Sequence, residues 1–178
     1  LFYREAAAPA DTTPPQTLES LTQLQGLRVN VGTPGSGIPN LMAKLLDSNH
    51  IDAAQLTLSE LGQTPATVAL LAGELDAIVF ASAPESSLVQ MLLQTPGIKL
   101  MDFAMSEAYS RRFSFLSPAV LPRGVVDLAA NIPPHNVRLV APTTTLLART
   151  ETHPALVPVS YTHLRAHETV LDLVCRLL

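Results

Sequence analysis

The sequence predicts an α/β fold with a mainly parallel sheet and flanking helices. Over residues 27–103, short apolar runs alternate with segments of helical periodicity, in the order strand, helix, strand, helix, strand, helix, strand. Val29 and Val31 are β-branched and two residues apart, as in a strand. The run DAIVF at 76–80 is almost continuously apolar, which is typical of a parallel strand covered on both faces.

The first part of the chain predicts a strand end, a linker and a short helical turn. Residues 1–4 (LFYR) resemble the end of a strand, and the proline-rich residues 5–16 (EAAAPADTTPPQ) are typical of a loop or linker. Leucines three residues apart then predict a helical turn: Leu18, Leu21 and Leu24. A buried strand follows over 27–31.

The next helix is expected to begin near Pro39, where a missing N–H costs little, and to end near Asn49. Its apolar stripe is Leu41, Met42, Leu45 and Leu46. A short strand over 55–58 comes next. Thr64 and Pro65 are expected to be the N-cap and first residue of a second helix that ends at Gly73. Its predicted inner face is Val68, Leu71 and Ala72.

After the strand at 76–80, Pro84 is expected to open a third helix, and 98–101 to form another core strand. The inward residues of that helix are expected to be Leu88, Met91 and Leu92. The regular alternation of strands and helices ends there, so we place a domain crossover between about residues 103 and 117. A helical connection is expected there, followed by strands around a proline-rich loop: 106–113, 115–121 and 137–140.

Composition narrows the class of protein. The 178 residues are 47% hydrophobic and 4% aromatic, which indicates an aliphatic core. The net charge of −4 argues against nucleic acid as a partner, because phosphate binding needs a basic patch. No run approaches the ~18 apolar residues of a membrane-spanning helix.

Residues 158–178 (PVSYTHLRAHETVLDLVCRLL) resemble the translation of a sequencing adapter, and we expect them to be a non-native tail. Cys175 is the single cysteine and lies in this tail. His163 and His167 have the spacing of metal ligands on a helix, but the tail's origin argues against a metal site. We also expect the chain to be a fragment at both ends.

The glycine-rich turn at 32–37 (GTPGSG) is the first candidate binding site. Its glycines allow a close approach of the backbone, and the N-terminus of the next helix can bind an anion or carboxylate. The candidate ligand-binding residues here are Thr33, Gly35, Ser36 and Gly37. The alternative for Ser36 is a hydroxyl that caps the helix, and the two roles are compatible.

Three familiar motifs do not fit this turn. A phosphate-binding loop requires Lys and then Ser or Thr after Gly37, where Ile38 and Pro39 stand. The dinucleotide-binding spacing of glycines is absent, and Pro34 occupies the first glycine position of a nucleophile elbow. No histidine pattern supports Ser36 as a nucleophile. We therefore expect no catalytic residue, cofactor or metal.

Three further places carry candidate residues. Ala81 and Ser82 follow the strand at 76–80, at the sheet edge where ligands bind in open α/β sheets, although Ser82 could instead cap the helix at Pro84. Gln63, with Thr64, begins the second helix. Tyr109 lies in the presumed crossover with two arginines that could pair with a carboxylate or simply be solvated: Arg111 and Arg112.

Taken together, these segments resemble the TAXI-type solute-binding proteins of TRAP transporters. The likeness rests on LRVNVGTPGSG, on LLAGELDAIVF and on SEAYSRRFSFLSPAVLPRGVVD, and covers roughly residues 1–157. Ile38 stands where that family usually has threonine.

The resemblance implies a two-lobed periplasmic binding protein of type II with one lobe incomplete. On that basis residues 1–26 are a fragment of lobe 1 with a linker, 27–103 form lobe 2, and 104–157 cross over and return to lobe 1. The implied function is binding a small organic acid or amino acid, glutamate-like, between the lobes. The protein would be periplasmic, or anchored facing the periplasm, and would deliver its ligand to TRAP membrane subunits.

Two other functions share this fold. One is the effector-sensing domain of a transcription regulator, which predicts a helix-turn-helix upstream. The other is an enzyme such as a dehydratase or thiamine-precursor synthase, which needs a reactive residue. An incomplete lobe could also leave strand edges exposed, so that the fragment does not fold alone.

Overall fold

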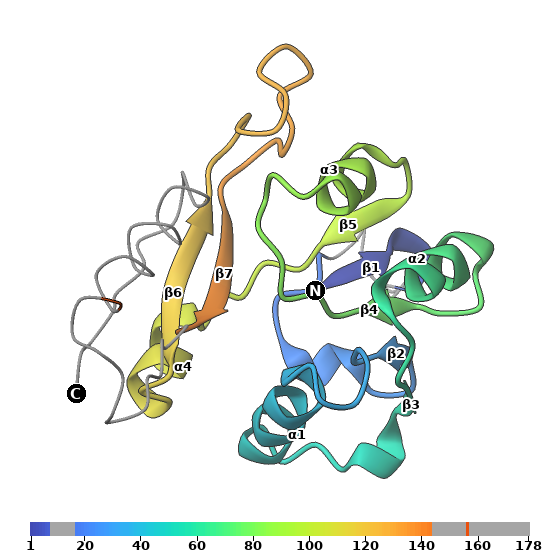
Figure 1. Cartoon of the computed structure of the whole chain (residues 1–178), viewed down its shortest axis with the longest axis vertical. Coiled ribbons are helices and arrows are strands. Elements are labelled where there is room, and N and C mark those ends of the chain that lie inside the picture. The colour runs from blue at the N-terminus through green and yellow to red at the C-terminus, as the bar shows by residue number, and fades with distance from the viewer. Residues whose placement is uncertain (8–16, 144–155, 157–178) are drawn as a thin grey trace.

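A five-stranded sheet lies at the centre of the chain, with strand order β3-β2-β4-β1-β5 (Figure 1). The computed structural model describes residues 1–7, 17–143 and 156. Most of the linker expected over 5–16, namely residues 8–16, and the tail expected over 158–178 therefore lie outside the described residues. The five strands are β1 (Phe2–Arg4), β2 (Arg28–Asn30), β3 (Thr57–Ser59), β4 (Ala77–Ile78) and β5 (Ile98–Leu100).

Four of these five strands run in one direction. β2 pairs in parallel with β3 and β4, whereas β1 pairs antiparallel with both β4 and β5. The prediction of an α/β fold with a mainly parallel sheet is therefore confirmed.

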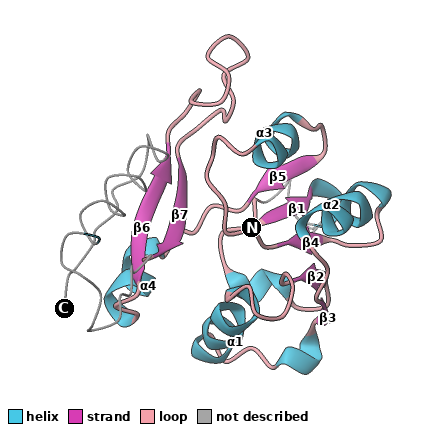
Figure 2. Cartoon of the chain, in the orientation of Figure 1, coloured by secondary structure: helices cyan, strands magenta, loops and turns pink. Residues whose placement is uncertain are grey.

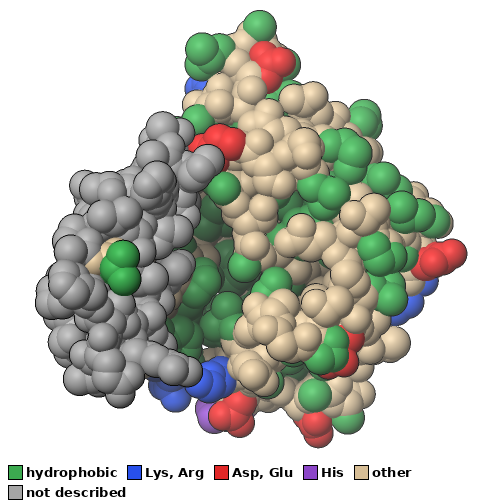
Figure 3. All heavy atoms as spheres, viewed as in Figure 1, with side chains coloured by type: hydrophobic (Ala, Val, Ile, Leu, Met, Phe, Trp, Pro, Cys, Tyr) green, Lys and Arg blue, Asp and Glu red, His purple; other side chains and the backbone are tan. Residues whose placement is uncertain are grey.

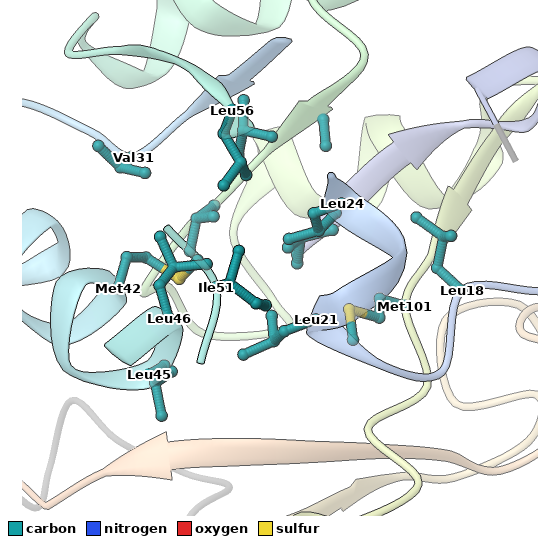
Figure 4. Packing of buried hydrophobic residues seen from close by; sticks show 14 of the residues in the cluster. Leu18, Leu21, Leu24, Val31, Met42, Leu45, Leu46, Ile51, Leu56 and Met101 are labelled. Atoms are coloured by element: carbon teal, nitrogen blue, oxygen red, sulfur yellow. The ribbon is translucent and has the colours of Figure 1, made fainter. Parts of the chain in front are cut away.

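Helices cover both faces of the sheet: α1 (Ile38–Ser48), α2 (Gln63–Ala72) and α3 (Ser87–Gln94). One apolar cluster joins α1 to the 3-10 turn η2 (Leu21–Leu24) and includes Tyr3 and Ala77 (Figure 4). A second cluster joins α2 and α3 and includes Phe2 and Ile78. Successive residues of β1 and β4 thus enter opposite cores, as the two-residue period of a strand requires.

The first residues of the chain are an integral part of this sheet. Tyr3 lies opposite both Ala77 of β4 and Lys99 of β5, so β1 fills the space between these strands. The Tyr3 hydroxyl accepts a hydrogen bond of 3.1 Å from the Leu18 N–H, and burial raises the pKa of Tyr3. The expected assignment of residues 1–26 to the other lobe thus differs from the structure, which places β1 in the sheet of residues 27–103.

The predicted inner face of α2 is wrong. Val68 and Leu71 are 62% and 46% exposed, and Ala72 is also exposed, whereas Ala66, Ala69 and Leu70 are buried. The N-cap of the helix is Gly62, which lies two residues before the expected N-cap, Thr64. Pro65 is tolerated there because the first-turn N–H groups of a helix have no partner within the helix.

The expected start and inner face of α3 also need correction. Pro84 lies in a turn closed by a hydrogen bond of 3.1 Å from Ser86 N–H to the Ala83 carbonyl, and the N-cap of the helix is Ser86. Leu92 is buried as expected, Leu88 is half-buried, and Met91 is 42% exposed.

The remaining elements follow the predicted order. α4 (Ser106–Arg112) precedes the antiparallel pair β6 (Leu116–Leu121) and β7 (Val137–Pro142), which lies beside the main sheet (Figure 2). Two further 3-10 turns are η1 (Glu5–Ala7) and η3 (Ala53–Gln55). Charged side chains are sparse on the described surface seen in Figure 3, in line with a charged fraction of 15%. Within the described residues, no helix has the length and apolar character needed to span a membrane.

An ion pair aligns the strands at the amino edge of the sheet. The Arg28 guanidinium donates to both Asp76 oxygens, at 2.9 and 2.7 Å, and to the Gly73 carbonyl at 2.8 Å. The Arg28 backbone N–H also donates to Asp76, at 2.9 Å. The Asp76 carboxylate thus joins β2 to the start of β4, and the Arg28 guanidinium joins β2 to the end of α2. Its hydrogen bonds with Arg28 hold the pKa of Asp76 below its usual range.

We predict that Asp76→Asn lowers the free energy of unfolding at pH 7 by about 1 kcal/mol, a small value because Arg28 is 42% exposed and solvent screens the pair. A depressed carboxyl pKa stabilises the fold above the unfolded value of about 3.9, and this contribution disappears as the pH falls through the folded value. Urea unfolding at pH 7 and near pH 3 measures the difference.

The matched control is Asp47→Asn, which alters an exposed carboxylate on α1. It should leave the unfolding midpoint unchanged at both pH values. An Asp76→Asn deficit of equal size at both pH values would contradict the role of the ionised carboxylate.

Candidate functional site

The carboxyl ends of three parallel strands meet at one edge of the sheet. β2 lies between β3 and β4, so the segments that follow these strands are neighbours: 31–37, 60–63 and 79–82. Hydrogen bonds of 2.9 Å continue the pairing past the strand ends, from Val31 N–H to the Ser59 carbonyl and from Val79 N–H to the Asn30 carbonyl. Ligands of open α/β sheets bind at this edge.

The segment after β2 is an exposed glycine turn. Gly32, Gly35 and Gly37 have φ values of +80°, +84° and +79°, which a side chain would strain. The Ser36 hydroxyl donates to the Thr33 carbonyl at 2.7 Å. The alternative that Ser36 caps α1 is therefore wrong, since Gly37 is the N-cap and α1 has no side-chain cap. The first-turn N–H groups of α1 open toward this turn.

The segment after β3 brings a second helix N-terminus beside this turn. Gly62 is the N-cap of α2 and provides no side-chain cap. A Cβ atom added to Gly62 would lie 3.9 Å from Cγ2 of Thr33, so the two segments are in close proximity. Gln63 is exposed at the first position of α2. The candidate residues Thr33 and Gln63, which are distant in sequence, therefore belong to adjacent segments.

Ala81 and Ser82 are exposed in the segment that follows β4. Ser82 is not the N-cap of α3, because that position belongs to Ser86, so the capping alternative is wrong. Through the pairing of β4 with β2, this segment starts from the same sheet edge as the glycine turn.

Tyr109 lies apart from the other candidates. Its hydroxyl donates to Oδ1 of Asn49 at 2.9 Å, and burial raises its pKa. Asn49 is the C-cap of α1, an 11-residue helix, which places it about 18 Å along the axis from the N-cap Gly37. A small cavity of about 140 Å³ beside this contact is lined partly by Arg112. The structure therefore does not unite Tyr109, Arg111 or Arg112 with the glycine turn.

Asn30 is the residue at this edge that the sequence analysis missed. It is fully buried, with 0% exposure, and its side chain bonds to the loop after β3. The available signal was a lone amide between the two apolar residues Val29 and Val31.

The charge of this edge favours recognition by dipoles rather than by side-chain cations. The segments 31–37, 60–63 and 79–85 contain Glu60 and Glu85 and no Lys or Arg. An anion here would therefore be bound by backbone N–H groups and hydroxyls. In the described part of the chain, no group of three or more His, Cys, Asp or Glu residues could hold a metal ion.

Comparison with known proteins gives the family. A family model described as the NMT1-like family matches residues 4–157. The chain belongs to the NMT1-like family. No curated protein matches it.

Among solved structures, this NMT1-like chain is similar to the periplasmic aliphatic sulphonate binding protein SsuA from Escherichia coli, with 16% identity and a TM-score of 0.41. The alignment covers 56% of this chain and 30% of that chain, so this chain spans less than a third of the neighbour's length.

We predict that Gly37→Ala destabilises the fold by about 1–2 kcal/mol more than Gly62→Ala does, because Gly37 has a φ of +79° whereas Gly62 has a φ of −64°. Both glycines are N-caps, so the lost preference for glycine at that position is common to the two variants. Urea unfolding of both variants gives the difference. Equal destabilisation would show that the left-handed conformation of Gly37 is not retained in solution.

Proposed function

We propose that this chain is part of an extracytoplasmic solute-binding protein of a TRAP-type transporter, of the TAXI type. In this proposal it binds a small organic acid or amino acid, glutamate-like, and delivers it to the membrane subunits. The NMT1-like match over residues 4–157 and the PGSG and GELDA segments support this assignment.

The observation that carries the proposal is the adjacency of two helix N-termini without side-chain caps. The first turns of α1 and α2 begin at Gly37 and Gly62, at the same edge of the sheet. Free N–H groups and the positive ends of the helix dipoles favour a carboxylate there.

The proposed roles follow from position. Backbone N–H groups of Gly35 and Gly37 donate to the ligand carboxylate, with the Ser36 and Thr33 hydroxyls alongside. The Ser36 N–H stays bonded to the Thr33 carbonyl, at 3.1 Å. Gln63 and Ser82 contact the rest of the ligand, as does the backbone of Ala81. Lobe 1 closes over this edge by a hinge motion and excludes water. Tyr109, whose hydroxyl is bonded to Asn49, would act on the side of lobe 1 rather than at the turn.

Binding and release break no covalent bond, so the proposal assigns no catalytic residue. The proposed location is the periplasm, because the ligand must be captured before it reaches the permease.

We predict that Ser36→Ala weakens binding of L-glutamate by about 1–2 kcal/mol, or roughly 5- to 30-fold in Kd, the scale of a hydrogen bond to a charged group. Isothermal titration calorimetry of the purified chain measures it. Ser48→Ala is the control, because the Ser48 hydroxyl makes the same kind of bond, 2.9 Å to the Leu45 carbonyl, at the other end of α1. Unchanged affinity for Ser36→Ala would remove Ser36 from the site.

Sequencing the source DNA across the gene with long reads tests the transporter partner. A secretion signal upstream and a TRAP permease gene alongside are the expected results. An upstream helix-turn-helix would favour an effector-sensing regulator instead. Clean reads that retain residues 158–178 would refute the adapter origin of the tail.

A further inference from the structure

One buried amide connects all three segments of the candidate site. The Asn30 side chain accepts hydrogen bonds from Leu61 N–H at 2.7 Å and from the Ser59 hydroxyl at 3.1 Å. Its Nδ2 donates to the Leu61 carbonyl at 3.1 Å. No buried side-chain polar atom in the described ranges is left without a partner, so this network is complete.

The backbone of Asn30 makes the third connection. Its carbonyl accepts the bond of 2.9 Å from Val79 N–H, and Val79 leads directly to Ala81 and Ser82. Its own chain continues through Val31 into the glycine turn. The side chain of Asn30 holds Leu61, and Leu61 directly precedes Gly62, the N-cap of α2.

We propose that Asn30 is a positioning residue, which fixes the mutual placement of the glycine turn, the N-terminus of α2 and the segment after β4. This inference rests on the proposed function, because it assigns Asn30 a role in ligand affinity without contact with the ligand. Displacement of one binding segment by about 1 Å is enough to disrupt a preorganised site.

The chemistry of the contact explains why an amide stands there. Leu61 presents both an N–H and a carbonyl to Asn30, and an amide is a donor and an acceptor at once. A leucine of similar size would leave both Leu61 groups without their partner in the protein interior. An aspartate would place a second oxygen against the Leu61 carbonyl.

Amide hydrogen exchange without any ligand tests the connection. In the wild-type chain, Leu61 N–H should be protected to within about tenfold of Val79 N–H, since both are bonded at the same buried residue. Exchange of Leu61 at the rate of an exposed loop would overturn the proposal, and this measurement does not depend on the folding of a variant.

The variant Asn30→Leu should accelerate exchange at Leu61 by at least about tenfold, while Leu45 in α1 stays protected. Asn49→Leu is the matched control, because Asn49 also donates from Nδ2 to a carbonyl and accepts through Oδ1, but at the far end of α1. It should leave the exchange of Leu61 unchanged.

Titration with L-glutamate provides the functional readout. Asn30→Leu should weaken binding by at least about tenfold, whereas the control Ser48→Ala should stay within about threefold. A folded Asn30→Leu variant with wild-type affinity would overturn the positioning role. If the wild-type chain does not bind L-glutamate, the proposed ligand fails, and the exchange data alone decide whether Asn30 fixes the three segments.

Discussion

The alignment of β2 with its neighbours is the constraint on which the rest of the structure depends. This strand has three residues, and each makes a different kind of contact. Arg28 binds Asp76 at the amino edge, Val29 is fully buried in the core, and Asn30 holds the loop after β3 at the carboxyl edge. A strand this short gains little from its ladder of backbone bonds, so side-chain contacts at its two ends set the register.

A second pair of an arginine and a carboxylate attaches the antiparallel strands β6 and β7 to the segment that follows β5. Arg138 of β7 donates to Asp102 through its side chain, at 2.6 Å, and through its backbone N–H, at 2.7 Å. Hydrogen bonds from Arg138 hold the pKa of Asp102 low, and Phe103 N–H returns a bond of 2.8 Å to the Arg138 carbonyl. The chain leaves the main sheet at this point, so its direction there is set by an ion pair reinforced by backbone bonds.

These contacts explain how the candidate site can be built without Lys or Arg side chains. Parallel strands place every following helix N-terminus at one edge, and glycine at both N-caps leaves the first N–H groups open. The ion pair of Arg28 with Asp76 lies at the opposite edge of the sheet, where α2 ends. The stabilising ion pair thus lies at the amino edge of the sheet and the candidate ligand-binding segments lie at the carboxyl edge. This separation allows the candidate segments to stay exposed.

The sequence by itself determined the order of strands and helices, the glycine turn and the edge of the sheet at which it lies. These features depend on neighbours in the chain: the period of apolar residues, the backbone freedom of glycine and the direction of parallel strands. The tertiary structure decided the features that depend on contacts between residues far apart in the chain. It placed β1 between β4 and β5, turned Ala66 rather than Val68 inward on α2, and set Tyr109 against Asn49. It also revealed Asn30, whose bonds reach 31 residues along the chain, because a buried amide is recognised by its partners, and the fold alone brings those partners to it.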